Sequence, residues 1–308
     1  MKGVSMNRFF ALSRTSHAIL DLATPAFVAL LWLGGLPEWH IIALSIFTAF
    51  AGYTAIYALN DLVGMAVDRE KFSLGGMNEG YSVEASEMRY PLARNILPYN
   101  KGLAWMLSWL VLGMIGSYFL NPVIVLILLG AAVLEVIYVL LLKVTYLRVF
   151  VSGLVKSSGP IAAVFVVDPS PSLSSLLLLF AWLFFWEVGG QNVPADWNDT
   201  VEDKRINAKT IPIHFGLDKA GIIVILTLVI TVAASAFLPT ISPLNLGLPY
   251  ILLSLTIGFI LLLQPAYQLN KNKTDGRFAA KLFDRASFYP VAQFALISIL
   301  LVVTTFTS

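Results

Sequence analysis

Long apolar stretches separated by polar segments run through the whole chain. Reading the stretches between polar breaks predicts helices near residues 17–34, 41–63, 102–120, 122–142, 148–167, 173–193, 219–238, 248–269 and 286–305. Each stretch is close to the roughly 20 apolar residues with which an α-helix crosses the hydrocarbon core of a bilayer. The pattern therefore predicts an all-α polytopic membrane bundle of about nine transmembrane helices, in a single domain over residues 1–308.

The composition supports the membrane as the solvent. Of the 308 residues, 58% are hydrophobic and 12% are charged, about half the charged share of a soluble domain. The absence of cysteine excludes disulfides, thiolate nucleophiles and zinc–sulfur sites. With a net charge of only +2, we expect membrane lipid and no nucleic acid as a partner, and the oligomeric state stays open.

The basic residues predict an orientation. Apart from Lys156, all lysines and arginines lie before the first predicted helix or in the second, fourth, sixth and eighth connections. By the positive-inside rule, these segments and the amino terminus face the cytoplasm. Because the number of spans is odd, the carboxyl terminus then lies outside, and we expect the cell (inner) membrane.

Two acidic clusters suggest an internal duplication. Asp61, Gly64 and Asp68 in the first correspond, at a constant offset, to Asp196, Asp199 and Asp203 in the second. The chain therefore reads as two four-helix halves, about 14–142 and 148–269, followed by a ninth helix at about 286–305.

The spacing of these acids indicates their chemistry. Positions 0, 3 and 7 share one face of a helix, so each half would present a row of carboxylates. Facing rows repel one another in a partly desolvated cavity unless hard cations lie between them. Mg²⁺ prefers oxygen ligands and keeps phosphate oxygens and waters beside one or two carboxylates. A lone aspartate would more simply be a solvated loop charge, but the matched spacing favours a Mg²⁺–diphosphate site.

These motifs resemble the UbiA family of intramembrane prenyltransferases. The family pattern of paired acidic motifs is met at Asn60, Asp61 and Asp68 and again at Asp196, Asp199 and Asp203. Supporting matches are Arg14, the Arg-Tyr-Pro-Leu run at 89–92, Tyr138, Lys143, the Lys-Thr-Ile-Pro run at 209–212, and Phe215 with Gly216. The resemblance covers most of the chain.

The resemblance implies transfer of a prenyl group from an allylic prenyl diphosphate to an acceptor. Its implied Mg²⁺ ligands are Asn60, Asp61, Asp68, Asp196, Asp199 and Asp203. The basic candidates for the diphosphate are Arg14, Arg69, Lys143 and Lys204. The alternative for these basic residues is ordinary positive-inside charge.

A substrate pocket is expected between the helices. Its candidate residues are Tyr53, Tyr57, Tyr138, Lys156, Glu187, Gln191 and Asn192, and Phe184 and Trp186 are further candidates for shielding an allylic cation. Charged groups at membrane depth normally face the bundle interior and have a partner. We therefore expect Lys156 to pair with Glu135 or Glu187, either as a structural ion pair or in acceptor recognition.

Two departures from the family pattern leave the acceptor open. Gly64 stands where an aspartate is common, and the run at 189–192 replaces a common Arg-Glu pair. An aromatic, quinone-precursor-like acceptor is the main expectation. A sugar phosphate, a glycerol phosphate lipid, or a non-catalytic isoprenoid-binding or transport role are the alternatives. The prenyl length stays open, and the connection over 69–101 is expected to form a cap.

Overall fold

The computed structural model describes residues 6–74 and 90–307, which form helices and turns without a strand. Within these residues, nine helical segments are long and apolar enough to cross a bilayer, which confirms the predicted number. They are Thr15–Leu33, Trp39–Ser73, Tyr99–Leu120, Pro122–Lys143, Arg148–Val167, Leu173–Asn198, Ile211–Ser235, Gly247–Lys271 and Gly276–Val303. The duplication into two halves stays a prediction, and residues 75–89 of the expected cap lie outside the described residues.

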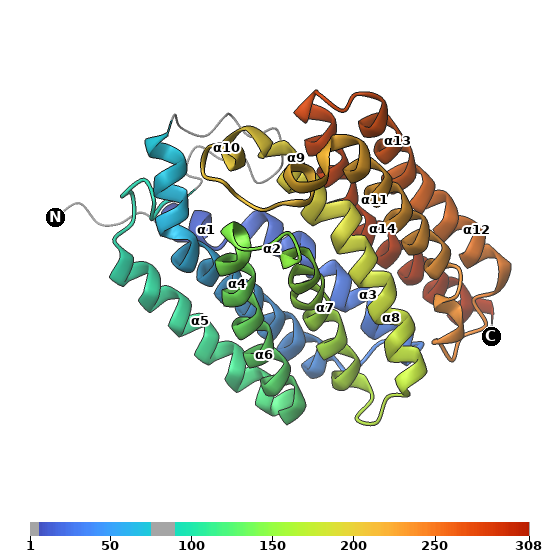
Figure 1. Cartoon of the computed structure of the whole chain (residues 1–308). Helices are drawn as coiled ribbons and strands as arrows, with labels where there is room; N and C mark the ends of the chain where they lie inside the picture. The colour runs from blue at the N-terminus through green and yellow to red at the C-terminus, as the bar shows by residue number, and fades with distance from the viewer. Residues whose placement is uncertain (1–5, 75–89, 308) are drawn as a thin grey trace.

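The helices lie side by side in one bundle (Figure 1). In chain order they are α1 (Met6–Leu12), α2 (Thr15–Asp21), α3 (Ala23–Leu33), α4 (Trp39–Ser73), α5 (Tyr99–Leu120), α6 (Pro122–Leu140), α7 (Arg148–Val167), α8 (Leu173–Trp186), α9 (Val193–Asn198), α10 (Thr200–Arg205), α11 (Ile211–Ser235), α12 (Gly247–Gly258), α13 (Gln264–Lys271) and α14 (Gly276–Thr307). Helix α3 packs against both α7 and α14, so the last span lies against the first.

Local sequence fixes the turns at the short-loop end of the bundle. The side chain of Asn121 accepts a hydrogen bond from Val123 N at 3.0 Å, and Pro122 occupies the first turn of α6, where its missing N–H costs nothing. Ser172 caps α8 in the same way through Ser175 N. Tight caps of this kind let consecutive spans turn back within a few residues.

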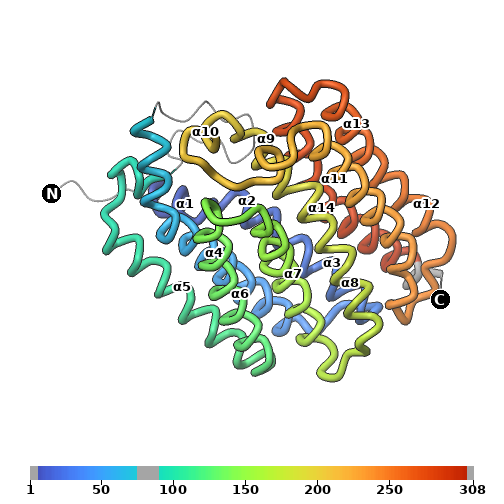
Figure 2. The backbone as a smooth tube through the Cα atoms, in the orientation of Figure 1, coloured from blue at the N-terminus to red at the C-terminus, as the bar shows by residue number. Residues whose placement is uncertain are grey.

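The longer connections gather at the opposite end, which is uppermost in Figures 1 and 2. There the last turns of α4 lie near α10, and α14 begins. The helices also extend farther here than the apolar pattern predicts. Helix α4 continues to Ser73 rather than ending near residue 63, and α14 begins at Gly276 rather than near residue 286. Hydropathy finds only the apolar part of a helix, whereas these polar turns continue beyond the hydrocarbon.

Two spans contain a π-helical turn, η2 (Glu187–Asn192) between α8 and α9, and η4 (Phe259–Leu263) between α12 and α13. Glycines allow η2 to pack closely. A Cβ on Gly189 would meet the Thr227 hydroxyl and would lie 3.1 Å from the backbone oxygen of Val224 on α11. A Cβ on Gly190 would lie 2.9 Å from Ala286 Cβ on α14. The glycine pair therefore lets η2 fit between these two helices.

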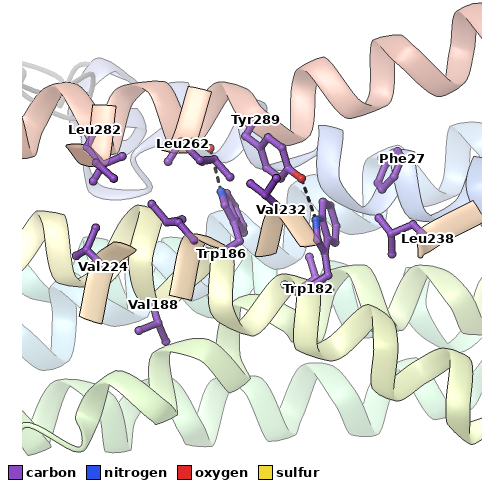
Figure 3. Packing of buried hydrophobic residues seen from close by; sticks show 14 of the residues in the cluster. Phe27, Trp182, Trp186, Val188, Val224, Val232, Leu238, Leu262, Leu282 and Tyr289 are labelled. Carbon is purple, nitrogen blue, oxygen red and sulfur yellow. Dashed lines mark hydrogen bonds between the residues drawn. The ribbon is translucent and has the colours of Figure 1, made fainter. Parts of the chain in front are cut away.

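The larger of the two core clusters joins α3 to helices of the second half of the chain and includes the contact between α8 and α14 (Figure 3). Trp182 Nε1 donates to the Tyr289 hydroxyl at 3.1 Å, and Trp186 Nε1 donates to the backbone oxygen of Ala286 at 3.0 Å. Outward-facing side chains are also apolar, as on α6, where Leu126 is 70% exposed. An apolar exterior around a core with satisfied indole N–H groups suits a protein that is surrounded by lipid.

We predict that Gly189→Val destabilises the fold by about 2 kcal/mol, because the new side chain would overpack against the α11 backbone. Gly130→Val is the matched control, since a Cβ on exposed Gly130 meets nothing within 4 Å. Thermal unfolding in detergent should show a lower melting temperature for Gly189→Val alone. Equal melting temperatures for the two variants would contradict the close approach of η2 to α11.

Candidate active site

The first carboxylate row lies on α4 near its polar end. Asp61 is buried, and Asp68 lies two turns farther along, half-buried. Arg14, between α1 and α2, reaches this row. Its Nη2 lies 3.1 Å from Asp61 Oδ1 and 3.3 Å from Asn60 Oδ1. The backbone of Arg14 is in the left-handed region at φ 45°, and this turn directs the start of α2 past α4.

The second row differs from the single helix that the spacing predicts. Asp196 lies on α9, Asp199 lies at the break between α9 and α10, and Asp203 lies on α10. The backbone hydrogen bonds from Asp199 N to Ala195 O, at 3.1 Å, and from Asp203 N to Asp199 O, at 2.9 Å, continue across the break. The i to i−4 register therefore survives, and Asp196 and Asp203 are both buried.

Two basic residues connect the rows to neighbouring elements. Lys71 Nζ on α4 lies 2.7 Å from Asp203 Oδ1, so the helix of the first row also contacts the second. Arg148 Nη1 on α7 lies 2.9 Å from Asp196 Oδ1, and the guanidinium lies over the ring of Tyr138 at 4.1 Å. Lys71 and Arg148 are themselves buried. The two rows are thus brought to one place, with cations among the carboxylates.

The surroundings of Asp203 show how strongly the acids depend on those cations. Burial is the main cause that raises the pKa of Asp203 to about 7; the Lys71 ammonium opposes this increase, and the charges of Asp196 and Asp199 add to it. A carboxylate in this setting ionises readily only when positive charge is close to it. The row therefore favours binding of cations.

Sequence reasoning missed both Lys71 and Arg148 as site residues. Lys71 follows Asp68 at helical spacing, but the predicted helix ended before it. Arg148 opens α7 and resembled ordinary positive-inside charge. Knowing that α4 continues to Ser73 would have placed Lys71 on the face of the acidic row.

The predicted diphosphate-binding residues lie in different surroundings. Arg14 contacts the first row, as described above. Arg69 is exposed and donates to Asn95 Oδ1 at 2.9 Å. Lys143 is exposed and pairs with Glu70, and Lys204 is exposed on α10. The structure thus brings one of the four predicted cations into contact with an aspartate of the rows.

A cavity of about 480 Å³ begins beside the rows and continues between the helices. At its polar end it is lined by Arg14, Asn60, Glu135 and Ala195. From there it follows α3, α4, α6 and α7, and on α4 its lining extends from Asn60 to Ile42, roughly five turns. The pocket residues predicted from the sequence line it: Tyr53, Tyr57, Tyr138, Lys156, Glu187, Gln191 and Asn192. Trp186 instead lies in the core, and Phe184 stacks on Phe150.

The prediction that Lys156 pairs with Glu135 or Glu187 is wrong. Lys156 Nζ lies 2.8 and 2.7 Å from the two carboxylate oxygens of Asp21, and the Tyr57 hydroxyl donates to the same carboxylate. The reason is the packing of α3 against α7, which brings Asp21, at the end of α2, to the middle of α7. The membrane-embedded charges still follow the general rule, since each member of this pair faces the interior and finds a partner.

The two glutamates that were expected to pair with Lys156 have neutral donors instead. Asn60 Nδ2 donates to Glu135 Oε1, and Ser152 Oγ donates to Glu187 Oε1 at 2.6 Å. The π-helical turn η2 carries Glu187, Gln191 and Asn192 to the cavity together. In a π-helix, residues i and i+5 lie on nearly the same face. Glu187 and Asn192 therefore share a face, whereas an α-helix would place them on different faces. Asn192 Nδ2 donates to the Tyr138 hydroxyl at 2.8 Å.

The donor set fits Mg²⁺ with a diphosphate. Five carboxylates and the Asn60 amide supply hard oxygen ligands, and nothing in the rows is a nitrogen or sulfur ligand. Among the described residues, no group of three acidic or histidine side chains could enclose a metal ion by itself. Ligands from outside the protein would have to complete the shell, as phosphate oxygens and waters commonly do for Mg²⁺.

Comparison with known proteins concerns the family and the fold. The model of the UbiA prenyltransferase family matches residues 22–288. Digeranylgeranylglyceryl phosphate synthase of Pyrococcus abyssi (strain GE5 / Orsay) is 24% identical over 95% of this chain and 98% of its own. The apo structure of a UbiA homolog from Aeropyrum pernix K1 has a TM-score of 0.72 at 17% identity, covering 92% of this chain and 98% of that one. A UbiA homolog from Archaeoglobus fulgidus, bound to GPP and Mg²⁺, has a TM-score of 0.66 at 17% identity, covering 94% and 99%.

We predict that Asp21→Asn destabilises the protein by about 3 kcal/mol, because it leaves the Lys156 ammonium without its buried partner. The double variant Asp21→Asn/Lys156→Met should recover most of the loss, since it removes both charges. Asp275→Asn, in an exposed pair with Arg277, is the control and should change little. If the single and double variants unfold at the same temperature in detergent, the pairing does not contribute as described.

Proposed function

Because the chain belongs to the UbiA prenyltransferase family, we propose that it transfers a prenyl group, with Mg²⁺, from an allylic prenyl diphosphate to a hydroxyl group of a glycerol phosphate lipid. The observation that supports this most directly is the pair of carboxylate rows at the polar end of a long apolar cavity. The rows suit a metal-bound diphosphate, and the cavity suits a prenyl tail.

The residues that would hold the metal are those of the two rows. Asp61, Asp68, Asp196, Asp199 and Asp203 offer carboxylates, and Asn60 offers an amide oxygen. Bound Mg²⁺ supplies positive charge to offset the charge that develops on a departing diphosphate. Gly64 leaves one position of the first row without a ligand. This suits a shell in which the substrate provides the remaining oxygens.

Arg14, Lys71 and Arg148 have a second role in this proposal. Each pairs with a carboxylate of the rows, at 3.1, 2.7 and 2.9 Å respectively. With Mg²⁺ bound among those carboxylates, the three side chains would be able to donate to diphosphate oxygens. Lys71 and Arg148 thus join Arg14 as proposed diphosphate residues, whereas exposed Arg69, Lys143 and Lys204 are more distant candidates.

The apolar part of the cavity would hold the prenyl tail. Small side chains line it on three helices, among them Ala29, Ala49 and Ala162. Tyr53 and Tyr57 lie between this region and the rows, where their rings can exclude water from an allylic centre and face its positive charge. A site at membrane depth suits an apolar substrate that reaches it from lipid.

The proposed acceptor differs from the main expectation from the sequence. That expectation was an aromatic acceptor, whereas the name of the Pyrococcus abyssi relative specifies a prenylated glyceryl phosphate. The alternative with a glycerol phosphate lipid is therefore favoured over an aromatic ring or a sugar phosphate. A non-catalytic binding role is disfavoured, because five aspartates and three paired cations remain at the site. We also propose that the rows face the cytoplasm, as the basic connections indicate.

We predict that the purified protein, with Mg²⁺ and geranylgeranyl diphosphate, prenylates a glycerol phosphate that already carries one prenyl ether, and does not prenylate 4-hydroxybenzoate. Asp61→Asn and Asp196→Asn should each lower the rate at least a hundredfold, because each removes a ligand charge. Asp275→Asn is the control, since Asp275 lies near the same end of the bundle and outside the rows. Mass spectrometry of the lipid products measures the rates of the wild-type protein and of the three variants.

Two outcomes would contradict this proposal in different ways. Prenylation of 4-hydroxybenzoate alone would restore the aromatic acceptor. Turnover of either row variant at the wild-type rate would remove the carboxylate rows from the reaction.

We predict that Ala49→Phe shortens the prenyl tail that the cavity accepts. Ala49 lies about 16 Å from Asn60 along α4, so a phenyl ring there would close the far part of the cavity. Activity with geranylgeranyl diphosphate should fall at least tenfold relative to activity with geranyl diphosphate. Gly130→Phe, on the outer face of α6, should leave the ratio unchanged. An unchanged ratio in Ala49→Phe would show that the tail lies elsewhere.

A further inference from the structure

Glu187 is a buried carboxylate that the metal site does not use. It lies on η2, is 6% exposed, and borders the cavity. One oxygen, Oε1, accepts the hydrogen bond from Ser152, and no described residue donates to the other, Oε2. An acceptor atom left without a donor in a membrane interior is costly, and such a group commonly serves function.

The position of Glu187 relative to the rows suits a second substrate. Glu187 precedes Asp196 by nine residues of the same span, or about 13 Å along the helix axis. That separation leaves room for a metal-bound diphosphate at Asp196 and for the reacting carbon between the two residues. Asn192 lies between them in the sequence and donates a hydrogen bond to the Tyr138 hydroxyl. The Arg148 guanidinium lies over the ring of Tyr138. Glu187 therefore lies deeper in the cavity than the diphosphate site, on the same wall.

The groups around Glu187 leave it available to take a proton. The titratable groups near it include Lys156 on α7, Asp21 on α2, and Glu135 and Tyr138 on α6. Lys156 is held by Asp21, and Glu135 accepts from Asn60. The residues that contact η2 from α11 and α14 include uncharged Val224, Thr227, Leu228, Phe283, Ala286 and Ser287. Glu187 is thus a carboxylate of the cavity lining with a buried oxygen to which no described group donates.

We propose that Glu187 is the general base that takes the proton from the acceptor hydroxyl, an inference that rests on the proposed function. The hydroxyl oxygen bonds to C1 of the prenyl group as the bond from C1 to the diphosphate oxygen breaks. The electron pair of that bond leaves with the diphosphate, and the hydroxyl proton moves to Glu187 Oε2. The hydrogen bond from Ser152 to Oε1 fixes the orientation of the carboxylate, and therefore also the position of Oε2. An aromatic ring carbon as acceptor would not need a base in this place at the moment of attack.

The test compares three variants, using geranylgeranyl diphosphate, Mg²⁺ and the glycerol phosphate monoprenyl ether as substrates. Glu187→Gln keeps the shape and the Ser152 partner but cannot take a proton. Glu187→Asp keeps a carboxylate on a shorter side chain. Ser152→Ala keeps Glu187 and removes only the hydrogen bond that orients it. Thermal unfolding in detergent establishes that each variant is folded.

We expect Glu187→Gln to lower kcat at least a hundredfold, the usual scale of general base catalysis, with less than a threefold change in either KM. The wild-type kcat should rise with pH through the acidic range. This rise should disappear in Glu187→Gln and persist in Glu187→Asp and Ser152→Ala. In Ser152→Ala, kcat should fall less than tenfold.

Two results would overturn the assignment. One is a Glu187→Gln kcat within threefold of wild type, and the other is a large loss of kcat with the wild-type pH profile retained, which would indicate a structural role. Failure of the wild-type protein to prenylate the acceptor would instead reject the proposed function. The two failures are therefore distinguishable.

Discussion

Repulsion between buried carboxylates is the constraint on which the arrangement of this protein depends. Several carboxylates are held at one end of a membrane bundle, where the surroundings screen charge far less than water does. Such a cluster is stable only with positive charge among its members. Arg14, Lys71 and Arg148 provide that charge in the described chain, each from a different part of the sequence. The same requirement supports the proposal that the cluster binds divalent cations and the anion that accompanies them.

The helical framework serves this cluster and the cavity beside it. The polar extension of α4 carries Lys71 to Asp203, and the short break between α9 and α10 keeps the second row in register. The π-helical turn η2 directs Glu187 and Asn192 to the cavity, and the glycine pair inside it allows close packing against α11 and α14. This one local change of helical pitch therefore places Glu187 and Asn192 at the cavity and the two glycines against the neighbouring helices.

The sequence predicted the fold class, the nine spans and the paired acidic motifs, because hydropathy and helical spacing are local properties. It did not predict the contacts between distant elements. Lys156 pairs with Asp21 rather than with either glutamate, since the packing of α3 on α7 decides the partner. Lys71 was missed because hydropathy ends a helix where its apolar part ends, and the π-helical turn has no periodic signal. The aromatic acceptor followed from what is common in the family, and the named relative supports the glycerol phosphate alternative instead.

Both carboxylate rows are proposed to hold the same metal ions. Electron paramagnetic resonance with Mn²⁺ in place of Mg²⁺ tests this proposal without requiring turnover. With geranylgeranyl diphosphate present, the protein should bind Mn²⁺, and removal of a carboxylate from either row, by Asp68→Ala on α4 or by Asp199→Ala beside α10, should weaken that binding at least tenfold. Mn²⁺ binding that is insensitive to one of the rows would contradict a shared site between the two halves of the chain.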